Sequence, residues 1–348
     1  MKFLVVRTDR IGDVVLSLPI AEILKERFPD AEVHFMISPS LKELLSNEPY
    51  IDKSISYNSQ CFRKSVALLK KEGFDIAFLV FPTLTLSLAL FLAHIPKRIG
   101  TGYRWYSLLL NRRIYEHRHT SEKHELVYNL GLLKAMGITT PVRKPHLHIK
   151  QEEKRGAIEF LKNMGIDSQR FIVVHPGSGG STLAWPEGNF KRLIKLIRGE
   201  LGYQILITGN EKEYAEVERI RDGCDENVVN IAGKTSLREL VAIISLTQLF
   251  IGNSTGPMHI ASAVDTKVVT FFPPSLVNRK TRWAPLSNAL VFEPPVPYCK
   301  RCIREKCPYY NCLSLISPEE VMKKIMVFHN RNHRDTETQR KHITVYSL

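Results

Sequence analysis

Short apolar runs rich in β-branched residues alternate with segments of helical periodicity along almost the whole chain. Runs such as KFLVVR (2–7) and FIVVHPG (171–177) are typical of buried strands, whereas GDVVLSLPIAEILKERFP (12–29) has the apolar spacing of a helix. Strands that alternate with helices require right-handed crossover connections, which place the strands parallel in one sheet. The sequence therefore predicts an α/β fold with parallel sheets.

The alternation is interrupted once, at ITTPVRKPHLHIK (138–150), which has two prolines and no periodicity. We interpret this stretch as a linker, because 348 residues suit two domains of ordinary size. The predicted organisation is one domain over 1–145, a second over 146–328, and a polar tail over 329–348. Two open sheets joined in this way leave a cleft between the loops at their carboxyl edges, where such folds bind ligands.

The charge balance favours anionic partners. The chain has 49 Lys and Arg against 35 Asp and Glu, a formal net charge of +14. Nucleic acid, an anionic lipid surface and a phosphorylated substrate all fit this charge, as does solubility alone. The sequence has no zinc-finger spacing, RNP pattern or basic heptad helix, so we do not expect a nucleic-acid partner.

Two apolar segments bear on localisation. The start, MKFLVVRTDRIGDVV, reaches charged residues too early for a signal peptide. The stretch TLTLSLALFLAHI (83–95) falls short of the roughly 20 residues that a membrane span needs. It is predicted to be a buried helix, with a membrane-facing helix as the alternative. We expect a cytoplasmic protein.

Four of the six cysteines are close together in the sequence. Cys299, Cys302, Cys307 and Cys312 form the pattern C-x2-C-x4-C-x4-C, which is similar to a small zinc knot. The spacing lacks the paired C-x-x-C form of strong zinc sites. We expect reduced structural thiols and no bound metal, with zinc as the alternative.

The stretch GNSTGPMHIASA (252–263) has the residues of a strand, a turn and a helix start. Ser254 or Thr255 suits the N-cap, and Gly256 permits close approach of a ligand to the backbone. Free N–H groups at such a helix start form an anion site, and His259 could donate to a phosphate oxygen. The alternative is a well-capped helix with a core histidine.

A second loop with small residues, VVHPGSGGSTLAWPEGNF (173–190), also joins a strand to a helix. It is neither a Walker motif nor a G-x-G-x-x-G turn. Two strand-to-helix anion loops in one half of the chain indicate a ligand with a diphosphate, such as a nucleotide sugar.

A third loop, RTDRIGDVV (7–15), places Asp13 in the first turn of a helix. There it either satisfies the helix dipole or acts as a general base, which the dipole would keep ionised at neutral pH.

Taken together, RTDRIGDVVLSLP, HPGSGGS…WPEGNF, NIAGKTSLRELVAII and GNSTGPMHIASA give the chain a family resemblance. It resembles the bacterial ADP-heptose:lipopolysaccharide heptosyltransferases, and the likeness runs from residue 1 to about 328. The resemblance implies the GT-B fold, with an acceptor-binding Rossmann-like domain first and a nucleotide-sugar-binding one second. It also implies inverting transfer, without metal or other cofactor, of heptose from ADP-heptose to an anionic inner-core acceptor.

The resemblance also implies roles for particular residues. Asp13 matches the general base, and Glu213 lies about where the family has an acid near the ribose. The residues implied to bind the donor are Ser178, Gly179, Gly180, Ser181, Thr182, Glu213, Ser254, Thr255, Gly256 and His259. Two positions depart from the family pattern: many members have Lys at the position of Leu183 and Asp at that of Ser254. These departures leave open which nucleotide sugar is the donor.

Basic residues dominate the segment from Lys97 to Lys123, where Glu116 and Glu122 are the acids. This surface is either an ordinary solvated face or a site for an anionic glycolipid, with contact to a membrane surface acting in the same direction. The candidate acceptor-binding residues are Arg10, Arg104, Arg112 and Arg113.

We therefore expect a glycosyltransferase. The alternatives are a nucleotide-sugar epimerase of the same fold, which would need no acceptor, and a non-catalytic relative that binds nucleotide sugar or glycolipid.

Overall fold

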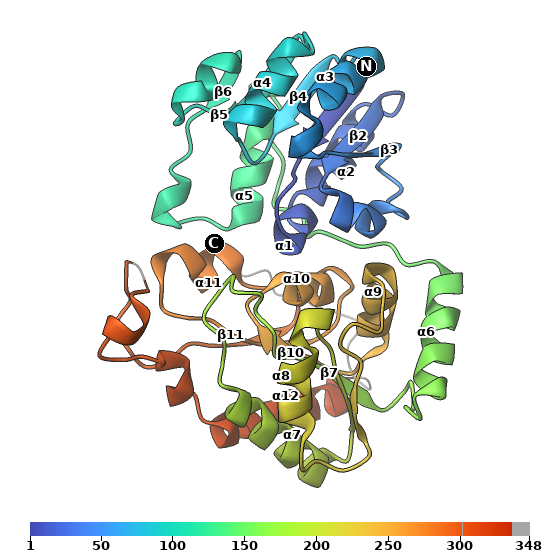
Figure 1. The fold of residues 1–348 in the computed structure, drawn as a ribbon, viewed down its shortest axis with the longest axis vertical. Coiled ribbons are helices and arrows are strands. Elements are labelled where there is room, and N and C mark those ends of the chain that lie inside the picture. Colours follow the sequence, from blue (N-terminus) through green and yellow to red (C-terminus); the bar gives the residue numbers. More distant parts are fainter. Residues whose placement is uncertain (301, 336–348) are drawn as a thin grey trace.

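The computed structural model describes residues 1–300 and 302–335, and their strands form two separate parallel sheets (Figure 1). The N-terminal sheet has the order β3-β2-β1-β4-β5-β6, and the C-terminal sheet has the order β12-β11-β10-β7-β8-β9. All neighbouring strands pair in parallel. This confirms the predicted α/β class with parallel sheets.

The first sheet contains β1 (Lys2–Val6), β2 (Glu32–Ile37), β3 (Lys53–Ser56), β4 (Ile76–Leu79), β5 (Lys97–Thr101) and β6 (Arg112–Ile114). The second contains β7 (Phe171–His175), β8 (Gln204–Ile207), β9 (Val228–Asn230), β10 (Phe250–Asn253), β11 (Val268–Phe271) and β12 (Ala289–Phe292). The helices around the first sheet are α1 (Ile11–Val15), α2 (Leu18–Arg27), α3 (Phe62–Glu72), α4 (Leu84–Leu92) and α5 (Glu125–Leu130). The helices that come after them in the chain are α6 (Gln151–Asn163), α7 (Glu187–Leu201), α8 (Tyr214–Arg221), α9 (Leu237–Leu246), α10 (Gly256–Ala263), α11 (Lys280–Trp283) and α12 (Pro318–Asp335).

Local sequence signals determine where several helices begin. In α9, the N–H of Glu239 donates to Ser236 Oγ (3.2 Å), and the N–H of Ser236 donates to Glu239 Oε2 (2.7 Å). This reciprocal capping box satisfies two backbone donors that the helix itself leaves unpaired. At α12, Ser317 Oγ accepts the N–H of Glu320 (3.1 Å). The sequence Ser-Pro-Glu-Glu (317–320) thus provides both the cap and a proline in the first turn of this helix.

Four details differ from what the sequence pattern indicated. The polar stretch before α5 contains the short strand β6, and β12 is a further edge strand that periodicity did not indicate. Helix α5 ends at Leu130 and continues as the 3₁₀ helix η5 (Gly131–Met136). Residues 138–150 form no helix or strand. Helix α12 extends to Asp335, so the first part of the predicted tail is helical, and 336–348 lie outside the described residues.

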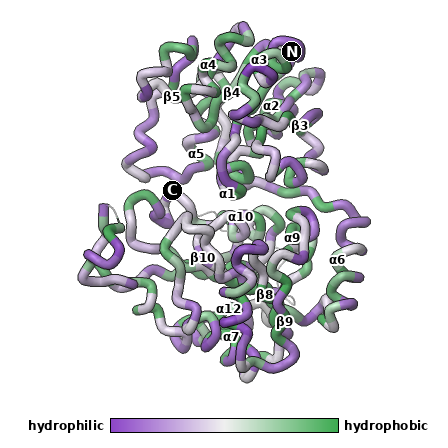
Figure 2. The backbone as a smooth tube through the Cα atoms, viewed as in Figure 1, coloured by the Kyte–Doolittle hydropathy of each residue, from purple (hydrophilic) through white to green (hydrophobic). Residues whose placement is uncertain are grey.

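Helix α4 is buried on one side only, so the prediction of a buried helix at 83–95 is half right. Its region is hydrophobic in Figure 2, and Leu86, Ala89 and Leu90 are buried. Phe91 and Leu92, however, are exposed. Among the described residues no helix is both long enough and apolar enough to span a membrane.

The two lobes contact each other through α1 and α10, which face each other across the junction in Figure 1. A Cβ on Gly12 would overlap the ring of His259, and a Cβ on Gly256 would lie 2.8 Å from Ile11 Cβ. Glycine at both positions therefore permits the close approach of the helices. One cluster of buried apolar side chains also extends through both lobes. It includes Phe3 of β1 in the first lobe, and Phe171 of β7 and Ile260 of α10 in the second.

Candidate active site

Two loops of the C-terminal lobe are fixed to each other by the buried side chain of Asn253. Its Nδ2 donates to the carbonyl of Pro176 (2.5 Å), and its Oδ1 accepts the N–H of Trp185 (2.9 Å). The Trp185 ring stacks on Phe271 with 4.1 Å between ring centroids. The loop with Ser178–Thr182 is thereby held beside the end of β10, because its two flanks are tied to that strand.

The loop itself adopts a conformation that requires its glycines. Gly179 and Gly180 have φ angles of 51° and 71°, the left-handed region that side chains with a Cβ rarely adopt. The N–H and the hydroxyl of Ser181 both donate to the carbonyl of Ser178, at 2.9 and 2.7 Å. Ser254 Oγ lies 3.4 Å from Thr182 Oγ1, so the two predicted donor loops meet.

Helix α10 begins at the predicted turn. Thr255 occupies the N-cap, but its side chain makes no capping hydrogen bond with the helix; its hydroxyl donates instead to the carbonyl of Asn253 (3.4 Å). The first turn of the helix therefore presents backbone N–H groups and the positive end of the helix dipole toward the junction. His259 is 5% exposed, and burial lowers the pKa of its ring to about 3. It is a neutral imidazole, which still carries one N–H donor.

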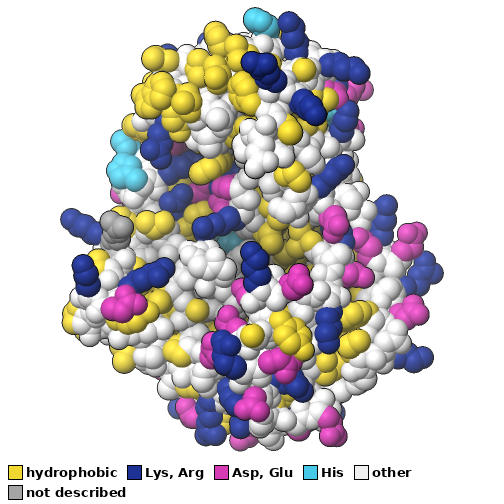
Figure 3. All heavy atoms as spheres, in the orientation of Figure 1, with side chains coloured by type: hydrophobic (Ala, Val, Ile, Leu, Met, Phe, Trp, Pro, Cys, Tyr) yellow, Lys and Arg dark blue, Asp and Glu magenta, His cyan; other side chains and the backbone are white. Residues whose placement is uncertain are grey.

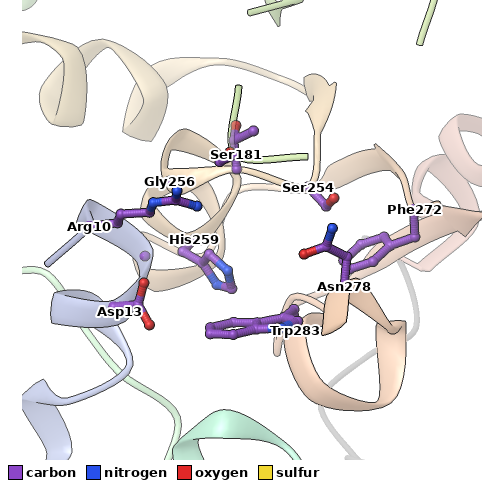
Figure 4. Close-up of a pocket in the computed structure, with 11 residues that line it drawn as sticks. Arg10, Asp13, Ser181, Ser254, Gly256, His259, Phe272, Asn278 and Trp283 are labelled. Carbon is purple, nitrogen blue, oxygen red and sulfur yellow. The ribbon is translucent and has the colours of Figure 1, made fainter. Parts of the chain in front are cut away.

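A cavity of about 490 Å³ lies between α1 and these loops (Figure 4). The N-terminal lobe contributes Arg10 and Asp13, which face the ring of His259 in the close-up. The full lining is Arg10, Gly12, Asp13, Ser181, Ser254, Thr255, Gly256, His259, Phe272, Asn278 and Trp283. The structure thus brings together Asp13 and five of the predicted donor residues. Ser178, Gly179, Gly180 and Thr182 belong to the same loop as Ser181 but do not line the cavity.

Glu213 lies beside the glycine loop, outside this lining. It ends the short 3₁₀ helix η6 (Glu211–Glu213), and its Oε2 accepts the N–H of Asn210 (2.9 Å). A Cβ on Gly177 would overlap the Glu213 carboxylate, so the carboxylate packs directly against the backbone of the loop. Leu183, at the first departure from the family pattern, packs against the apolar core of this lobe.

A larger cleft of about 2110 Å³ adjoins the first cavity on the side of the N-terminal lobe. Arg10, Asp13 and Trp283 line both. Arg104 lines the cleft, as does Arg118, which belongs to the predicted basic segment. Arg112 and Arg113 lie on the edge strand β6 and line neither cavity.

Asp13 is part of a buried network of charges centred on Arg7. The Arg7 guanidinium contacts the Asp13 carboxylate, donates from Nε to Asp9 Oδ1 (2.7 Å) and reaches Glu125 Oε1 at 3.3 Å. Burial lowers the pKa of Arg7, but the three carboxylates outweigh it and raise that pKa above its usual range. Arg7 is therefore a permanent positive charge beneath Asp13.

Burial raises the pKa of Asp13 to about 6, and the Arg7 charge opposes this rise. A helix N-terminus lowers the pKa of a carboxyl group, but here the pKa of Asp13 rises. The cost of burying the charged carboxylate is larger than the stabilisation from the helix dipole and Arg7. At pH 7 the carboxylate is still mostly ionised, as the sequence predicts, but it is a stronger base than an ordinary aspartate. Glu125 behaves differently: burial would raise its pKa, but Arg118, Arg7 and Arg282 lower it to about 2.

The same network joins the lobes. Arg282 of the C-terminal lobe places Nε and Nη2 at 2.9 and 2.8 Å from Glu125 Oε2. Beside this pair, His124 Nε2 donates to the carbonyl of Ala284 (2.9 Å). These contacts across the junction therefore help to fix the position of Asp13 relative to the donor loops.

Sequence reasoning missed several residues of this site. Arg7 was included in a predicted strand, although a charge at the end of an apolar run was a signal. Glu125, Arg282 and Trp283 come from distant segments and carry no local motif. The described part of the chain contains no group of three or more His, Cys, Asp or Glu placed to hold a metal ion. The four clustered cysteines form no disulfide bond in the structure.

Solved structures share this arrangement of two sheets. The structure of E. coli ADP-heptose lipopolysaccharide heptosyltransferase II matches with a TM-score of 0.80 and 23% identity, covering 96% of this chain and all (100%) of that one. E. coli heptosyltransferase WaaC, solved with ADP, matches with a TM-score of 0.70 and 19% identity, covering 95% and 99%. The fold, with its ligand cavities between two facing Rossmann-like lobes, defines the GT-B class.

The chain belongs to glycosyltransferase family 9 (heptosyltransferase), whose family model matches residues 62–312. Among curated relatives, lipopolysaccharide heptosyltransferase 2 of Salmonella typhimurium is 26% identical over 323 residues, covering 87% of this chain and 88% of that protein. The protein is thus a glycosyltransferase, which sets aside the epimerase and non-catalytic alternatives and confirms the resemblance inferred from the sequence.

Proposed function

We propose that this enzyme is an inverting heptosyltransferase that moves heptose from ADP-heptose to a lipopolysaccharide inner-core acceptor. One observation carries the proposal. Among the acidic residues that the structure describes, Asp13 alone lines both the small cavity beside the donor loops and the large cleft of the other lobe. A base at that position can contact an acceptor hydroxyl while the donor lies opposite.

The donor is proposed to bind in the smaller cavity, with its diphosphate at the start of α10. Backbone N–H groups and the helix dipole there stabilise an anion. Ser181 and Ser254 add hydroxyl donors on the opposite wall, and His259 offers a neutral N–H. Arg10 is the cationic side chain of this lining and lies near Gly256 in Figure 4. It supplies the positive charge that the family's lysine, replaced here by Leu183, would otherwise provide.

The remaining predicted donor residues support this placement less directly. Gly179 and Gly180 shape the loop that carries Ser181, and Thr182 ties it to Ser254. Glu213, packed against Gly177, is proposed to accept from the ribose hydroxyls of the nucleotide.

The acceptor is proposed to bind in the larger cleft, where Arg10, Arg104 and Arg118 are suited to the phosphates and acidic sugars of an inner core. Of the carboxylates there, Glu125 is too weak a base, with a pKa of about 2 and three arginine partners. Asp13, with a pKa of about 6, has nearly the basicity that general base catalysis at neutral pH favours.

The reaction is a single displacement. The acceptor hydroxyl oxygen forms a bond to the anomeric carbon as the bond from that carbon to the diphosphate oxygen breaks, which inverts the configuration. The hydroxyl proton passes to Asp13 Oδ, and ADP leaves with the electron pair. Arg10 and the start of α10 stabilise the charge that grows on the leaving diphosphate. No step requires a metal ion or another cofactor.

The relatives support this assignment, since they include an ADP-heptose lipopolysaccharide heptosyltransferase and a heptosyltransferase solved with ADP. We further propose that the enzyme acts in the cytoplasm at the inner face of the inner membrane, where it would reach a lipid-anchored acceptor.

Calorimetric titration of the purified protein with ADP, UDP, GDP and CMP, with EDTA present, tests the donor. Preferential binding of ADP, followed by transfer from ADP-heptose to an inner-core acceptor, is the expected result. Preference for UDP or GDP would contradict the donor, and loss of binding on adding EDTA would contradict metal independence.

A further inference from the structure

Exposed large hydrophobic side chains gather in one part of the N-terminal lobe. In the part of the chain that the structure describes, eight of the 20 exposed large hydrophobic residues fall within 35 residues of sequence, 81–115. They are Phe81, Leu84, Phe91, Leu92, Tyr103, Trp105, Leu108 and Tyr115. Figure 3 shows hydrophobic side chains gathered at the upper left of the molecule, over the region of α4 and β5, with Lys and Arg side chains beside them. A group of exposed hydrophobic side chains of this kind is typical of an interaction surface.

The most exposed of these side chains lie on the 3₁₀ helix η3 (Trp105–Leu109). Trp105 is 73% exposed and Leu108 is 78% exposed. Residues three apart in a 3₁₀ helix are eclipsed, so both project from the same side. Beside them, Phe91 and Leu92 project from the last turn of α4. We call these four residues the α4–η3 surface.

The two elements of this surface are held together by specific contacts. Tyr106 donates from its hydroxyl to the carbonyl of Pro82 (2.9 Å) at the start of α4. Arg98 donates to the carbonyl of Ile95 (2.5 Å) after α4 and to that of Leu109 (2.8 Å) at the end of η3. The apolar side chains are therefore presented on a built scaffold.

The segment that carries the α4–η3 surface has charged residues of one sign only. Residues 76–115 contain no Asp or Glu. They contain five cations, which are Lys97, Arg98, Arg104, Arg112 and Arg113. None of the five has an ion-pair partner among residues 1–300 and 302–335. This placement gives a role to Arg112 and Arg113, which line neither cavity.

We propose that the α4–η3 surface docks on an anionic phospholipid bilayer. Aromatic and aliphatic side chains partition into the interfacial region, while surrounding Lys and Arg are attracted to anionic head groups. A second copy of this chain is a poorer occupant, because the unpaired cations of two copies would repel each other. The surface also adjoins the larger cleft, since Leu84 and Tyr103 belong both to the eight exposed hydrophobic residues and to the cleft lining.

The inference rests on the proposed function in one respect: a membrane-anchored acceptor would enter the cleft from the bilayer beside it. Docking here would therefore orient the cleft toward its substrate. The physical claim, that this surface binds anionic bilayers, is separable from the catalytic claim.

Co-sedimentation with phosphatidylcholine vesicles, with and without phosphatidylglycerol, tests the proposal. The test variant is the double substitution Trp105→Ser and Leu108→Ser, at two residues that line neither the small cavity nor the larger cleft. The matched control is Leu315→Ser with Val327→Ser, two hydrophobic residues exposed to 52% and 51% on the other lobe. Nucleotide calorimetry and transfer to a deacylated, water-soluble acceptor, done on each variant without vesicles, test catalysis independently.

The wild-type protein is expected to bind vesicles with phosphatidylglycerol and to release them as salt rises. The test variant should bind about tenfold or more weakly, while the control keeps wild-type affinity and both keep ADP binding and soluble transfer. Trp105 emission should shift to the blue on vesicle addition.

Three results would overturn the proposal: no binding by the wild type, wild-type binding by the test variant, or a wild-type dimer in sedimentation velocity that the test variant lacks. Failure of soluble transfer in the wild type would instead count against the proposed function.

Discussion

Removing the positive charge of Arg7 should shift the pH dependence of the enzyme. Asp13 must be ionised to accept a proton, so activity rises with pH through its pKa of about 6. An opposite charge in contact with a carboxylate lowers its pKa by about 1–3 units, and about 1–2 units are expected here because Arg7 is shared with Asp9 and Glu125. The substitution Arg7→Gln should therefore move the acid limb of kcat/KM from about 6 to about 7–8.

The size of the effect follows from the ionised fraction. With a pKa of about 6, about nine-tenths of Asp13 is ionised at pH 7, and this falls to between about half and one-tenth in the variant. Activity at pH 7 should drop about two- to tenfold and recover at alkaline pH. Arg7→Lys, which keeps the charge, should retain an acid limb close to the wild-type one.

The assay is a transfer rate across a pH series, together with thermal unfolding of each variant. Removing one partner of a buried ion pair costs about 3–5 kcal/mol of stability, so the unfolding curve must show that Arg7→Gln is folded at the assay temperature. A folded Arg7→Gln enzyme whose acid limb remains near 6 would refute the reasoning, because Arg7 would then not set the basicity of Asp13.

Two further predictions concern the junction. Gly12→Ala should cost about 1–3 kcal/mol in thermal unfolding and reduce transfer, because its Cβ would overlap His259. Its control is Gly199→Ala, in an open helical position, which should stabilise the protein by about 0.5–1 kcal/mol. Equal stability of the two variants would contradict the close contact between α1 and α10. Arg10→Ala should weaken ADP binding about tenfold or more in calorimetry, because a charged hydrogen bond contributes about 1.5–3 kcal/mol. The exposed Arg192→Ala is its control, and unchanged ADP affinity in Arg10→Ala would remove Arg10 from the donor site.

The sequence predicted the two sheets well because strand and helix periodicity is a local property. The runs that became β1, β7 and β10 are mainly apolar and are buried on both faces, as parallel strands are. The edge strand β6 has the sequence RRI, with two exposed arginines, so no apolar pattern indicated it. Its pairing with β5 depends on the sheet already being formed.

The candidate site, too, could be predicted only where it depends on local sequence. The turn with Thr255 and Gly256 is a contiguous motif, and its helix start follows from residue types alone. The pKa of Asp13 could not be predicted, because it depends on burial at a junction and on Arg7 folding beneath it. Likewise, the exposed side of α4 was not predicted, because an apolar run does not indicate which of its faces another element covers.

The central claim is that Asp13 is the base of a sugar transfer from a nucleotide donor. The most direct test compares transfer from ADP-heptose by wild type and by Asp13→Asn, with ADP binding measured on the same samples. A positioned general base contributes about 10²–10⁴-fold, so the variant should lose at least about a hundredfold in rate while ADP affinity stays within about threefold. Transfer by the variant within about tenfold of wild type would contradict the account, because proton removal would then not depend on the one carboxylate that both cavities share.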